Sequence, residues 1–271
     1  MKFSVLMSLY IKERAEYFTE CMESILRQTE LPDEIVIVLD GPVTPEVTSE
    51  IERYDTMHPG IIKLVPLPKN VGLGPALAEG ILHCTYELVA RMDTDDVCRE
   101  DRFERQLYEF ERDQALDICG CHIKEFDGAV DNIVSSRSVP LTHDEIAKYQ
   151  RQRSAFNHMT VMYKKSAVIK AGNYQDAPLM EDDLLWVHML MSGAVCKNID
   201  DHLVYVRTGD AMIARRGGYA YFKKYKRGRK MILATGYISR WDYFKTVGVQ
   251  FVVALMPAKI RTLIFTGLLR R

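Results

Sequence analysis

The stretch ELVARMDTDDVCREDR, residues 87–102, joins an apolar segment to a dense group of acids. Three of four consecutive positions are aspartates, namely Asp93, Asp95 and Asp96. Carboxylates this close together repel one another, so they stay ionised only beside a cation, sugar hydroxyls or open solvent. The apolar residues before them are typical of a buried strand. This stretch therefore predicts a polar site at the end of a strand.

Segments of two kinds alternate before this site. Strand-like apolar runs occupy residues 3–10, 33–41, 61–68 and 87–93. Segments with apolar residues at helical spacing occupy residues 15–28, 44–58 and 74–85. Strands separated by single helices indicate right-handed βαβ crossovers and a parallel sheet. With 271 residues, 47% of them hydrophobic, the chain is large enough for a full core, and we expect an α/β fold.

Polar residues follow each of the four predicted strands. They are Ser8, Tyr10, Asp40, Asn70, Gly72, Asp93, Asp95 and Asp96. A single acid at a strand end is more often a helix cap or a turn residue than a functional group. In a parallel sheet, however, these positions meet at one edge, where ligands bind beyond the carboxyl ends of the strands. Their common location favours a binding site.

The pattern argues against a dinucleotide as the ligand. That reading requires a G-x-G-x-x-G turn directly after a strand. No glycine follows the first strand in YIKERAE, residues 10–16, and NVGLGPAL, residues 70–77, has Leu77 where the third glycine is needed. We therefore do not expect NAD or FAD.

The six cysteines do not form a repeating pattern, and the first residues read as a strand instead of a signal peptide, so we do not expect secretion. The one tight cluster is CGCH, residues 119–122. It has no second pair at the spacing of a zinc site, so buried thiols in a strand are favoured over a metal site.

Charge is distributed unevenly along the chain. From Tyr205 to the end there are fifteen Lys or Arg and two acids, against 21 basic and 35 acidic residues in the first 204. A basic segment on an acidic body indicates an anionic surface or ligand.

Six segments, in order, carry a resemblance to a known family. They are FSVLMSLYIKE (3–13), SILRQTELPDEIVIVLDGP (24–42), NVGLGPALAEGI (70–81), ARMDTDDVCREDRFERQ (90–106), FNHMTVMYKKSAVIKAGNY (156–174) and MEDDLLWVHML (180–190). Together they resemble the successive blocks of a family 2 glycosyltransferase, most closely the bacterial enzymes that build exopolysaccharide, capsule or O-antigen. The resemblance covers about residues 1–210. It implies a GT-A fold, with a mostly parallel central sheet flanked by helices and a nucleotide-diphosphate sugar across the strand ends.

The resemblance also implies roles for the acids at the fourth strand. By position in the family's D-x-D block, Asp95 is expected to ligate a metal ion and Asp93 to face the metal or the nucleotide ribose, with Asp96 as a neighbouring support. Mn²⁺ or Mg²⁺ is the expected ion, because both favour hard oxygen ligands. Bound there, it neutralises the charge of the departing nucleoside diphosphate.

Further residues are expected to bind the nucleotide sugar. Asp40 matches an acid that contacts the base, and Ser8, Tyr10 and Glu13 lie in the segment that lines the nucleotide pocket. The remaining members of this predicted set are Asn70, Gly72 and Arg102. For Arg102, a contact to the diphosphate and an internal salt bridge remain equal alternatives.

The acceptor hydroxyl must lose a proton as it attacks, so a general base is needed. Acids in a first helical turn are common, since they complement the helix dipole. Aligned with the family's E-D-x-x-L-W pattern, however, Asp182 falls on the base, with Glu181 as the next candidate and Trp186 beside the acceptor. His158, in the block HMT, is either a pocket residue or an internal histidine.

We therefore expect an inverting glycosyltransferase that transfers a sugar from a nucleotide-diphosphate donor, with a preference for UDP, to a lipid-linked oligosaccharide. A sugar-phosphate nucleotidyltransferase is the alternative enzyme, although SLYIKERAE (8–16) lacks its glycine-rich signature. A non-catalytic module that binds sugar nucleotide or lipid is the other alternative.

Residues 211–271 are expected to form a basic, amphipathic helical extension. Basic and aromatic residues alternate in RRGGYAYFKKYKRGRK (215–230), but no nucleic-acid module accompanies them, so we expect no nucleic acid. The apolar run VGVQFVVALMP (247–257) is too short to span a bilayer. PAKIRTLIFTGLLRR (257–271) resembles an interfacial helix, and docking on the protein's own core is the alternative. The clustered charge favours anionic lipid, which predicts a peripheral protein on the cytoplasmic face of the bacterial membrane.

Overall fold

The computed structural model describes residues 1–208 and 217–256. The strands are β1 (Phe3–Leu9), β2 (Glu34–Leu39), β3 (Ile62–Pro66), β4 (Leu88–Arg91), β5 (Val97–Cys98), β6 (Leu116–Phe126), β7 (Ile133–Arg137), β8 (Met162–Lys164) and β9 (Val195–Arg207). The helices are α1 (Ala15–Leu26), α2 (Pro45–Met57), α3 (Leu73–His83), α4 (Arg102–Arg112), α5 (His143–Gln150), the 3₁₀ turn η1 (His158–Thr160), α6 (Lys165–Lys170), α7 (Glu181–Met191), α9 (Gly218–Ala234) and α10 (Arg240–Leu255).

The first four strands form the parallel half of the sheet. β2 and β4 flank β1, and β3 pairs with β2, all in parallel. Leu6, in the middle of β1, lies opposite Val36 on one side and Arg91 on the other. The predicted strands and the intervening helices α1, α2 and α3 are therefore confirmed. Their carboxyl ends lie at one edge of the sheet, as the βαβ pattern requires.

The later strands extend this sheet in mixed directions. The order is β3-β2-β1-β4-β8-β6-β9-β5, and β7 pairs with β6. β8 runs antiparallel to β4 and β6, whereas β9 runs parallel to β6. The short strand β5 pairs antiparallel with the end of β9, where Val97 lies opposite Tyr205. This last pairing brings the segment after the aspartates against the end of β9.

Helices cover both faces of the sheet, because side chains alternate along each strand. One core joins Phe3, Val5 and Met7 of β1 to helices α1, α2 and α4. The other joins Leu6 and the opposite face of β2 to α3, α5, α6 and α7. All six cysteines are buried and unpaired, and Cys119 and Cys121 lie in β6, as expected for thiols inside a strand.

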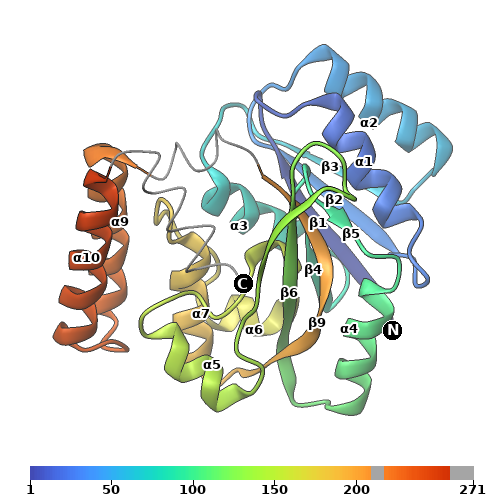
Figure 1. The fold of residues 1–271 in the computed structure, drawn as a ribbon. Helices are drawn as coiled ribbons and strands as arrows, with labels where there is room; N and C mark the ends of the chain where they lie inside the picture. Colours follow the sequence, from blue (N-terminus) through green and yellow to red (C-terminus); the bar gives the residue numbers. More distant parts are fainter. Residues whose placement is uncertain (209–216, 257–271) are drawn as a thin grey trace.

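The extension adds a further layer outside α7. Helices α9 and α10 form a hairpin, and α7 lies between this hairpin and the sheet (Figure 1). A third core joins Met180 and Leu184 to Ile232 and Tyr243. Gly228 allows the close approach, since a Cβ there would lie 2.3 Å from the Met180 Cγ atom. The part of the extension that the structure describes thus docks on the protein's own core.

The sequence predictions for the extension concern a membrane span, an interfacial helix and a domain boundary. Within the described residues, no helix combines the length and the apolar content needed to cross a bilayer. The predicted interfacial helix at 257–271 lies outside the described residues, and the division of the chain at residue 210 stays a prediction.

Asp242 fastens the hairpin to the body of the protein. It closes a capping box with Ser239 at the start of α10, in which the Ser239 hydroxyl donates to Asp242 over 2.7 Å. The same buried carboxylate accepts a hydrogen bond from the Arg151 guanidinium at 2.8 Å and one from the Gln152 amide at 3.1 Å. Because a helix cap and an ion pair share one carboxylate, the position of the hairpin depends on it.

We expect Asp242→Ala to lower the free energy of unfolding by about 2–3 kcal/mol, since it removes hydrogen bonds to a buried charged group and leaves their donors without a partner. Chemical denaturation would measure the change. Asp55→Ala, at an exposed position of α2, is the matched control and should shift the midpoint little. An equal shift in both variants would show that Asp242 does not fasten the hairpin.

Candidate active site

The acidic turn after β4, residues 93–96, gathers its three carboxylates into one cluster. Ligand oxygens of Asp93, Asp95 and Asp96 all lie within 4.8 Å of one another. The Arg207 amide donates to one oxygen of Asp96 over 2.9 Å. The other oxygen, Oδ2, is buried and has no hydrogen-bond partner. The cluster therefore holds more negative charge than its protein neighbours compensate.

The electrostatics of the cluster fit a divalent cation. Burial raises the pKa of Asp95 to about 7, and the charges of Asp93 and Glu13 add to the rise. Burial also raises the pKa of Asp96 well above its ordinary value, with Asp95 and Asp93 contributing. Hard oxygen donors in such an arrangement suit Mg²⁺ or Mn²⁺. Asp93 and Asp95, which are half-buried, are the residues placed to hold it.

Arg91 lies beneath this cluster and was missed by the sequence analysis. Its side chain is only 1% exposed and pairs with Asp93 over 2.5 Å. Its Nε and Nη1 atoms are buried without hydrogen-bond partners. A signal existed in the sequence, because Arg91 is a cation at the end of the otherwise apolar strand β4. Buried charge of this kind is rare without a partner and is often found at functional sites.

Arg207, at the end of β9, holds the acidic turn from the other side and was also missed. Its Nε donates to the Asp95 carbonyl over 3.1 Å, and its Nη2 pairs with Glu20. The guanidinium lies 4.0 Å from the centre of the Tyr17 ring. No pattern in the sequence links a residue so far along the chain to the aspartates.

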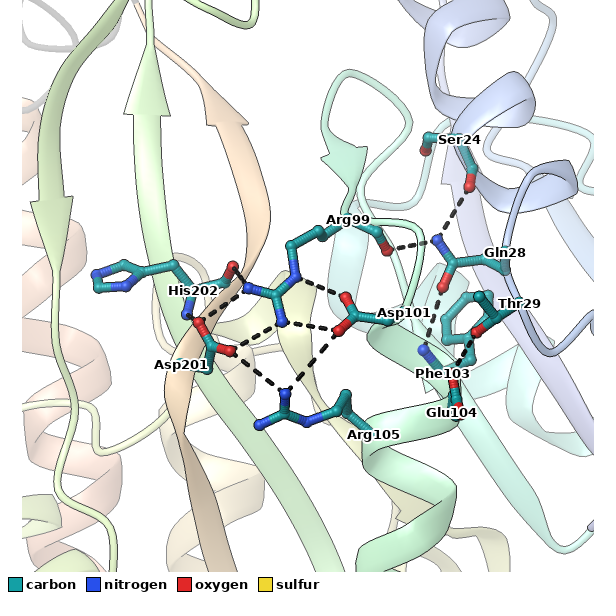
Figure 2. A network of polar contacts seen from close by, with 10 residues as sticks. All are labelled: Ser24, Gln28, Thr29, Arg99, Asp101, Phe103, Glu104, Arg105, Asp201 and His202. Atoms are coloured by element: carbon teal, nitrogen blue, oxygen red, sulfur yellow. Dashed lines mark hydrogen bonds and ion pairs between the residues drawn. The ribbon is translucent and has the colours of Figure 1, made fainter.

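A polar network fixes the segment that follows the turn (Figure 2). Arg99 pairs with Asp101 over 2.5 Å and with Asp201 over 2.8 Å, and Arg105 lies beside the same two acids. At the other end, the Gln28 amide donates to the Arg99 carbonyl over 2.6 Å. These contacts join the segments that follow α1 and β5 to α4 and β9, so the residues after the acidic turn are anchored to both halves of the sheet.

Asp40 organises the neighbouring strand end. Its carboxylate accepts hydrogen bonds from the Val71 amide at 2.6 Å, the Asn70 side chain at 2.9 Å and the Gly72 amide at 3.1 Å. Gly41 makes this contact possible, since its φ is +83° and a Cβ there would lie 2.6 Å from the Asn70 nitrogen. The structure thus brings the predicted residues Asp40, Asn70 and Gly72 together. A contact from Asp40 to the base stays a prediction.

The predicted residues near the end of β1 lie in different settings. Glu13 accepts a hydrogen bond from the Thr94 hydroxyl, which links it to the acidic turn, and burial raises its pKa. Tyr10 is exposed and Ser8 is half-buried. Both are open to a ligand in this structure, and their contact with a nucleotide stays a prediction.

Arg102 does not occupy the position predicted for it. Its side chain is completely buried. It donates to the Arg91 carbonyl over 2.7 Å and to Gln106 over 3.0 Å, and no acid pairs with it among the described residues. Neither alternative, a diphosphate contact or an internal salt bridge, holds. Arg102 instead supplies hydrogen bonds inside the core, on the face of α4 that packs against the sheet.

Asp182, the predicted base, lines a cavity of 590 Å³ between the sheet, the start of α7 and the hairpin. Burial raises the pKa of Asp182 well above its ordinary value, and the charges of Asp183 and Glu181 add to the rise. A carboxylate with a raised pKa binds a proton more tightly, which is the property of a general base. Glu181 is half-buried in the same helical turn, and burial raises its pKa also.

Arg91 connects the two acidic groups. Its charge opposes the rise in pKa of Asp95 and also that of Asp182 and Glu181. Arg91 thus pairs with the acidic turn through Asp93, and its charge also acts on the two acids at the start of α7.

The two aromatic candidates beside Asp182 differ in access. His158 lines the cavity, but it is buried and bonds to the Tyr174 hydroxyl over 2.9 Å, and burial lowers its pKa well below the ordinary value. His158 is thus both a pocket residue and an internal histidine, the two alternatives that the sequence left open. Trp186 is 1% exposed and packs against Phe156 and His158. It is a core residue, so the expected place beside the acceptor is wrong.

Comparison with known proteins identifies the family. The model of "Glycosyl transferase family 2" matches residues 4–176. The chain belongs to glycosyltransferase family 2. This membership confirms the resemblance carried by the six sequence segments, and it removes the support for a nucleotidyltransferase.

Similar glycosyltransferases match all or nearly all of the chain. An uncharacterised glycosyltransferase of Haemophilus influenzae is 44% identical over 100% of both chains. The amylovoran biosynthesis glycosyltransferase AmsE of Erwinia amylovora is 38% identical over 97% of each. The UDP-Gal:alpha-D-GlcNAc-diphosphoundecaprenol beta-1,3-galactosyltransferase of Escherichia coli is 34% identical over 100% of this chain and 97% of that protein.

Solved structures show the fold of this glycosyltransferase. Residues 1–349 of Staphylococcus aureus TarS, in complex with UDP-GlcNAc, match with a TM-score of 0.63 at 17% identity, over 97% of this chain and 70% of TarS 1–349. The mannosyltransferase PcManGT of Pyrobaculum calidifontis, in complex with GDP-Man and Mn²⁺, matches with a TM-score of 0.62 at 17% identity, over 98% and 79%. The expected GT-A fold is confirmed.

Proposed function

We propose that this glycosyltransferase transfers a hexosyl group from a UDP-sugar to a lipid-linked oligosaccharide, with inversion at the anomeric carbon, in the biosynthesis of a bacterial surface polysaccharide. The observation that carries the proposal is the presence of two acidic groups on which the charge of Arg91 acts. An acidic turn suited to a cation lies on the strand ends, and a carboxylate with a raised pKa lines an open cavity at the start of α7. The printed names of the AmsE and galactosyltransferase relatives support the acceptor class and the pathway.

The donor binds across the carboxyl ends of β1, β2 and β4 in this proposal. Asp93 and Asp95 hold Mn²⁺ or Mg²⁺, and the UDP-GlcNAc and Mn²⁺ complexes of structural neighbours support this choice. A cation held by these two residues would neutralise the charge that develops on the diphosphate as the glycosidic bond breaks. Arg91 and Arg207 keep the acidic turn in place, and Arg91 limits the repulsion among its carboxylates.

Asp182 acts on the acceptor. Its carboxylate takes the proton of the acceptor hydroxyl while the hydroxyl oxygen forms a bond to the anomeric carbon. The electron pair of the broken bond leaves with the nucleoside diphosphate. A single displacement of this kind inverts the anomeric configuration, which NMR of the product would report.

Because Asp95 holds the cation, we expect Asp95→Asn to lower the transfer rate by at least about 100-fold, since loss of a metal's charge stabilisation costs several kcal/mol. The measurement is transfer from UDP-sugars in the presence of Mn²⁺. Asp55→Asn on α2 is the matched control, and thermal unfolding checks that the fold persists. Full turnover by Asp95→Asn, or by the wild type in excess chelator, would contradict metal dependence.

The base is tested separately from donor binding. Asp182→Asn should lower kcat by at least about 100-fold, the lower end of general-base contributions, while calorimetry shows little change in UDP affinity. Asp176→Asn, at an exposed position before α7, is the control. A loss of UDP binding would place Asp182 in the donor site. An unchanged kcat would show that Asp182 is not the general base.

The surface of α10 supports attachment to a membrane. Trp241 is 74% exposed and Phe244 is 66% exposed, although both are large and apolar. Val252 and Leu255 follow at helical spacing and are also exposed, so they form one stripe along the helix. With the basic residues of the extension, this stripe combines apolar insertion and charge attraction. We propose that the protein is peripheral on the cytoplasmic face of the cell membrane.

We expect the protein to float with vesicles that contain anionic lipid, and high salt to release it in part, because each basic residue near the surface contributes about 1 kcal/mol that ions screen. Replacing Trp241 and Phe244 together by serine should weaken flotation and spare UDP binding. These substitutions test the surface alone. Deleting residues 247–271 would also remove the buried Ala254 and so disturb the packing of the hairpin.

The matched control replaces two exposed apolar residues outside the hairpin, Leu82 and Tyr108, by serine. It should float as well as the wild type. If both double variants bind equally, or if the wild type ignores anionic vesicles at low salt, the α10 stripe is not a membrane surface.

A further inference from the structure

The cavity that contains Asp182 also contains four cations. Arg137 at the end of β7, Arg153 after α5, Arg229 of α9 and Lys245 of α10 all line it. The acids that line it are Glu125, Asp182 and Asp183. Glu125 accepts a hydrogen bond from Ser135, and Asp183 accepts one from Gln150 over 2.8 Å. Charged side chains of both signs thus line the cavity. A side chain that already binds another protein group is less available to a ligand.

Two of the cations are engaged with protein groups. Arg229 donates to the Arg151 carbonyl over 2.7 Å, and Lys245 donates to the Gln152 amide oxygen over 2.8 Å. Both contacts hold the α9–α10 hairpin against the loop after α5. These side chains therefore close one wall of the cavity.

Arg137 and Arg153 have fewer contacts with protein groups than Arg229 and Lys245. In the described part of the chain, no carboxylate lies within 4 Å of either guanidinium, and no hydrogen bond from the Arg153 side chain is present. Arg137 donates to the Ser154 carbonyl over 2.7 Å, while its Nε is buried without a partner. Burial, and then the nearby charge of Arg153, lower the pKa of Arg137 to about 10. The charges of Asp183 and Asp182 act in the opposite direction, but neither acid forms an ion pair with Arg137 or Arg153, so an anion bound between the two guanidinium groups would relieve their repulsion.

The location of the pair indicates which anion it binds. Asp40, Asp93 and Asp95, at the strand ends where the donor is expected, do not line this cavity, whereas the predicted base does. A group bound at the pair is thus close to the group that meets Asp182. Arginine suits diphosphate esters in particular, because its planar fork donates two parallel hydrogen bonds to neighbouring oxygens.

Apolar side chains also line the cavity. Ile123 and Val206 belong to the strands of the sheet, and Val249 belongs to α10. Val249 is itself exposed and lies on the helix that carries the stripe of Trp241 and Phe244. The cavity therefore reaches the helix whose surface is proposed to lie on the membrane.

We propose that Arg137 and Arg153 form a subsite for the diphosphate of the lipid-linked acceptor, so that the sugar hydroxyl reaches Asp182 while the lipid leaves along α10. The inference rests on the proposed function and deepens it, since it requires that the sugar and the lipid are joined by a diphosphate. The nucleotide donor also carries a diphosphate, so the experiment must separate the two sources.

The probe is farnesyl diphosphate, titrated calorimetrically into the full-length protein that is saturated with UDP and Mn²⁺. UDP then fills the donor site, and the remaining affinity reports the second site. We expect binding by the wild type, and Arg137→Gln and Arg153→Gln should each weaken it by about tenfold or more, the effect of losing a charge-assisted contact. Arg137→Lys should retain part of the affinity. Arg112→Gln, at an exposed position of α4 outside the cavity, should change nothing.

UDP titrations of the same variants complete the test. Unchanged UDP affinity with weakened farnesyl diphosphate binding supports the subsite. Weakened UDP affinity would assign the pair to the donor, and equal farnesyl diphosphate binding in all variants would overturn the proposal, as would its absence in the wild type. The proposed function fails by a different result, in which the wild type transfers no sugar from any UDP-sugar although both ligands bind.

Discussion

Charge compensation in the acidic turn is the constraint on which the site depends. Three carboxylates within 4.8 Å repel one another, and two arginines hold the turn that carries them. Arg91 pairs with Asp93 from inside β4, and Arg207, at the end of β9, donates to the Asp96 carboxylate and to the Asp95 carbonyl. The parallel half of the sheet supplies the acids, and the mixed half supplies one of the cations. The site therefore belongs to the sheet as a whole.

A second level of organisation lies outside the sheet. Helix α7 carries Asp182 at its first turn and buries Leu184 against the α9–α10 hairpin. The helix that positions the predicted base is thus held by the same hairpin that forms one wall of the cavity. Asp242 contributes to this arrangement, because its pairing with Arg151 fixes the loop that also bears Arg153. The proposed base, acceptor subsite and membrane surface accordingly all lie on α7, on the hairpin or beside them.

Sequence predicted the elements whose signals are local. Periodicity located β1 to β4 and α1 to α3, and the alternation of these elements placed Asp40, Asn70 and Asp93 at one sheet edge. The family motifs did not show whether a given side chain on a helix faces the core or a ligand. Arg102 and Trp186 were assigned to ligands from their motif positions, yet both are buried. Arg207 lies more than a hundred residues from the acidic turn, and its proximity depends on the pairing of β9 with β6 and β5, which spacing does not encode.

The pairing of β5 with β9 has a consequence for how the molecule is made. Arg207 bonds to Asp95 and Asp96 across more than a hundred residues of sequence. Contacts between such distant segments form late, since the entropy of closing a long loop opposes them. During synthesis, the parallel strands and their helices emerge from the ribosome before β9. Until the end of β9 is translated, the acidic turn lacks the hydrogen bonds from Arg207, so an unfinished chain carries the residues of the proposed donor site without these contacts.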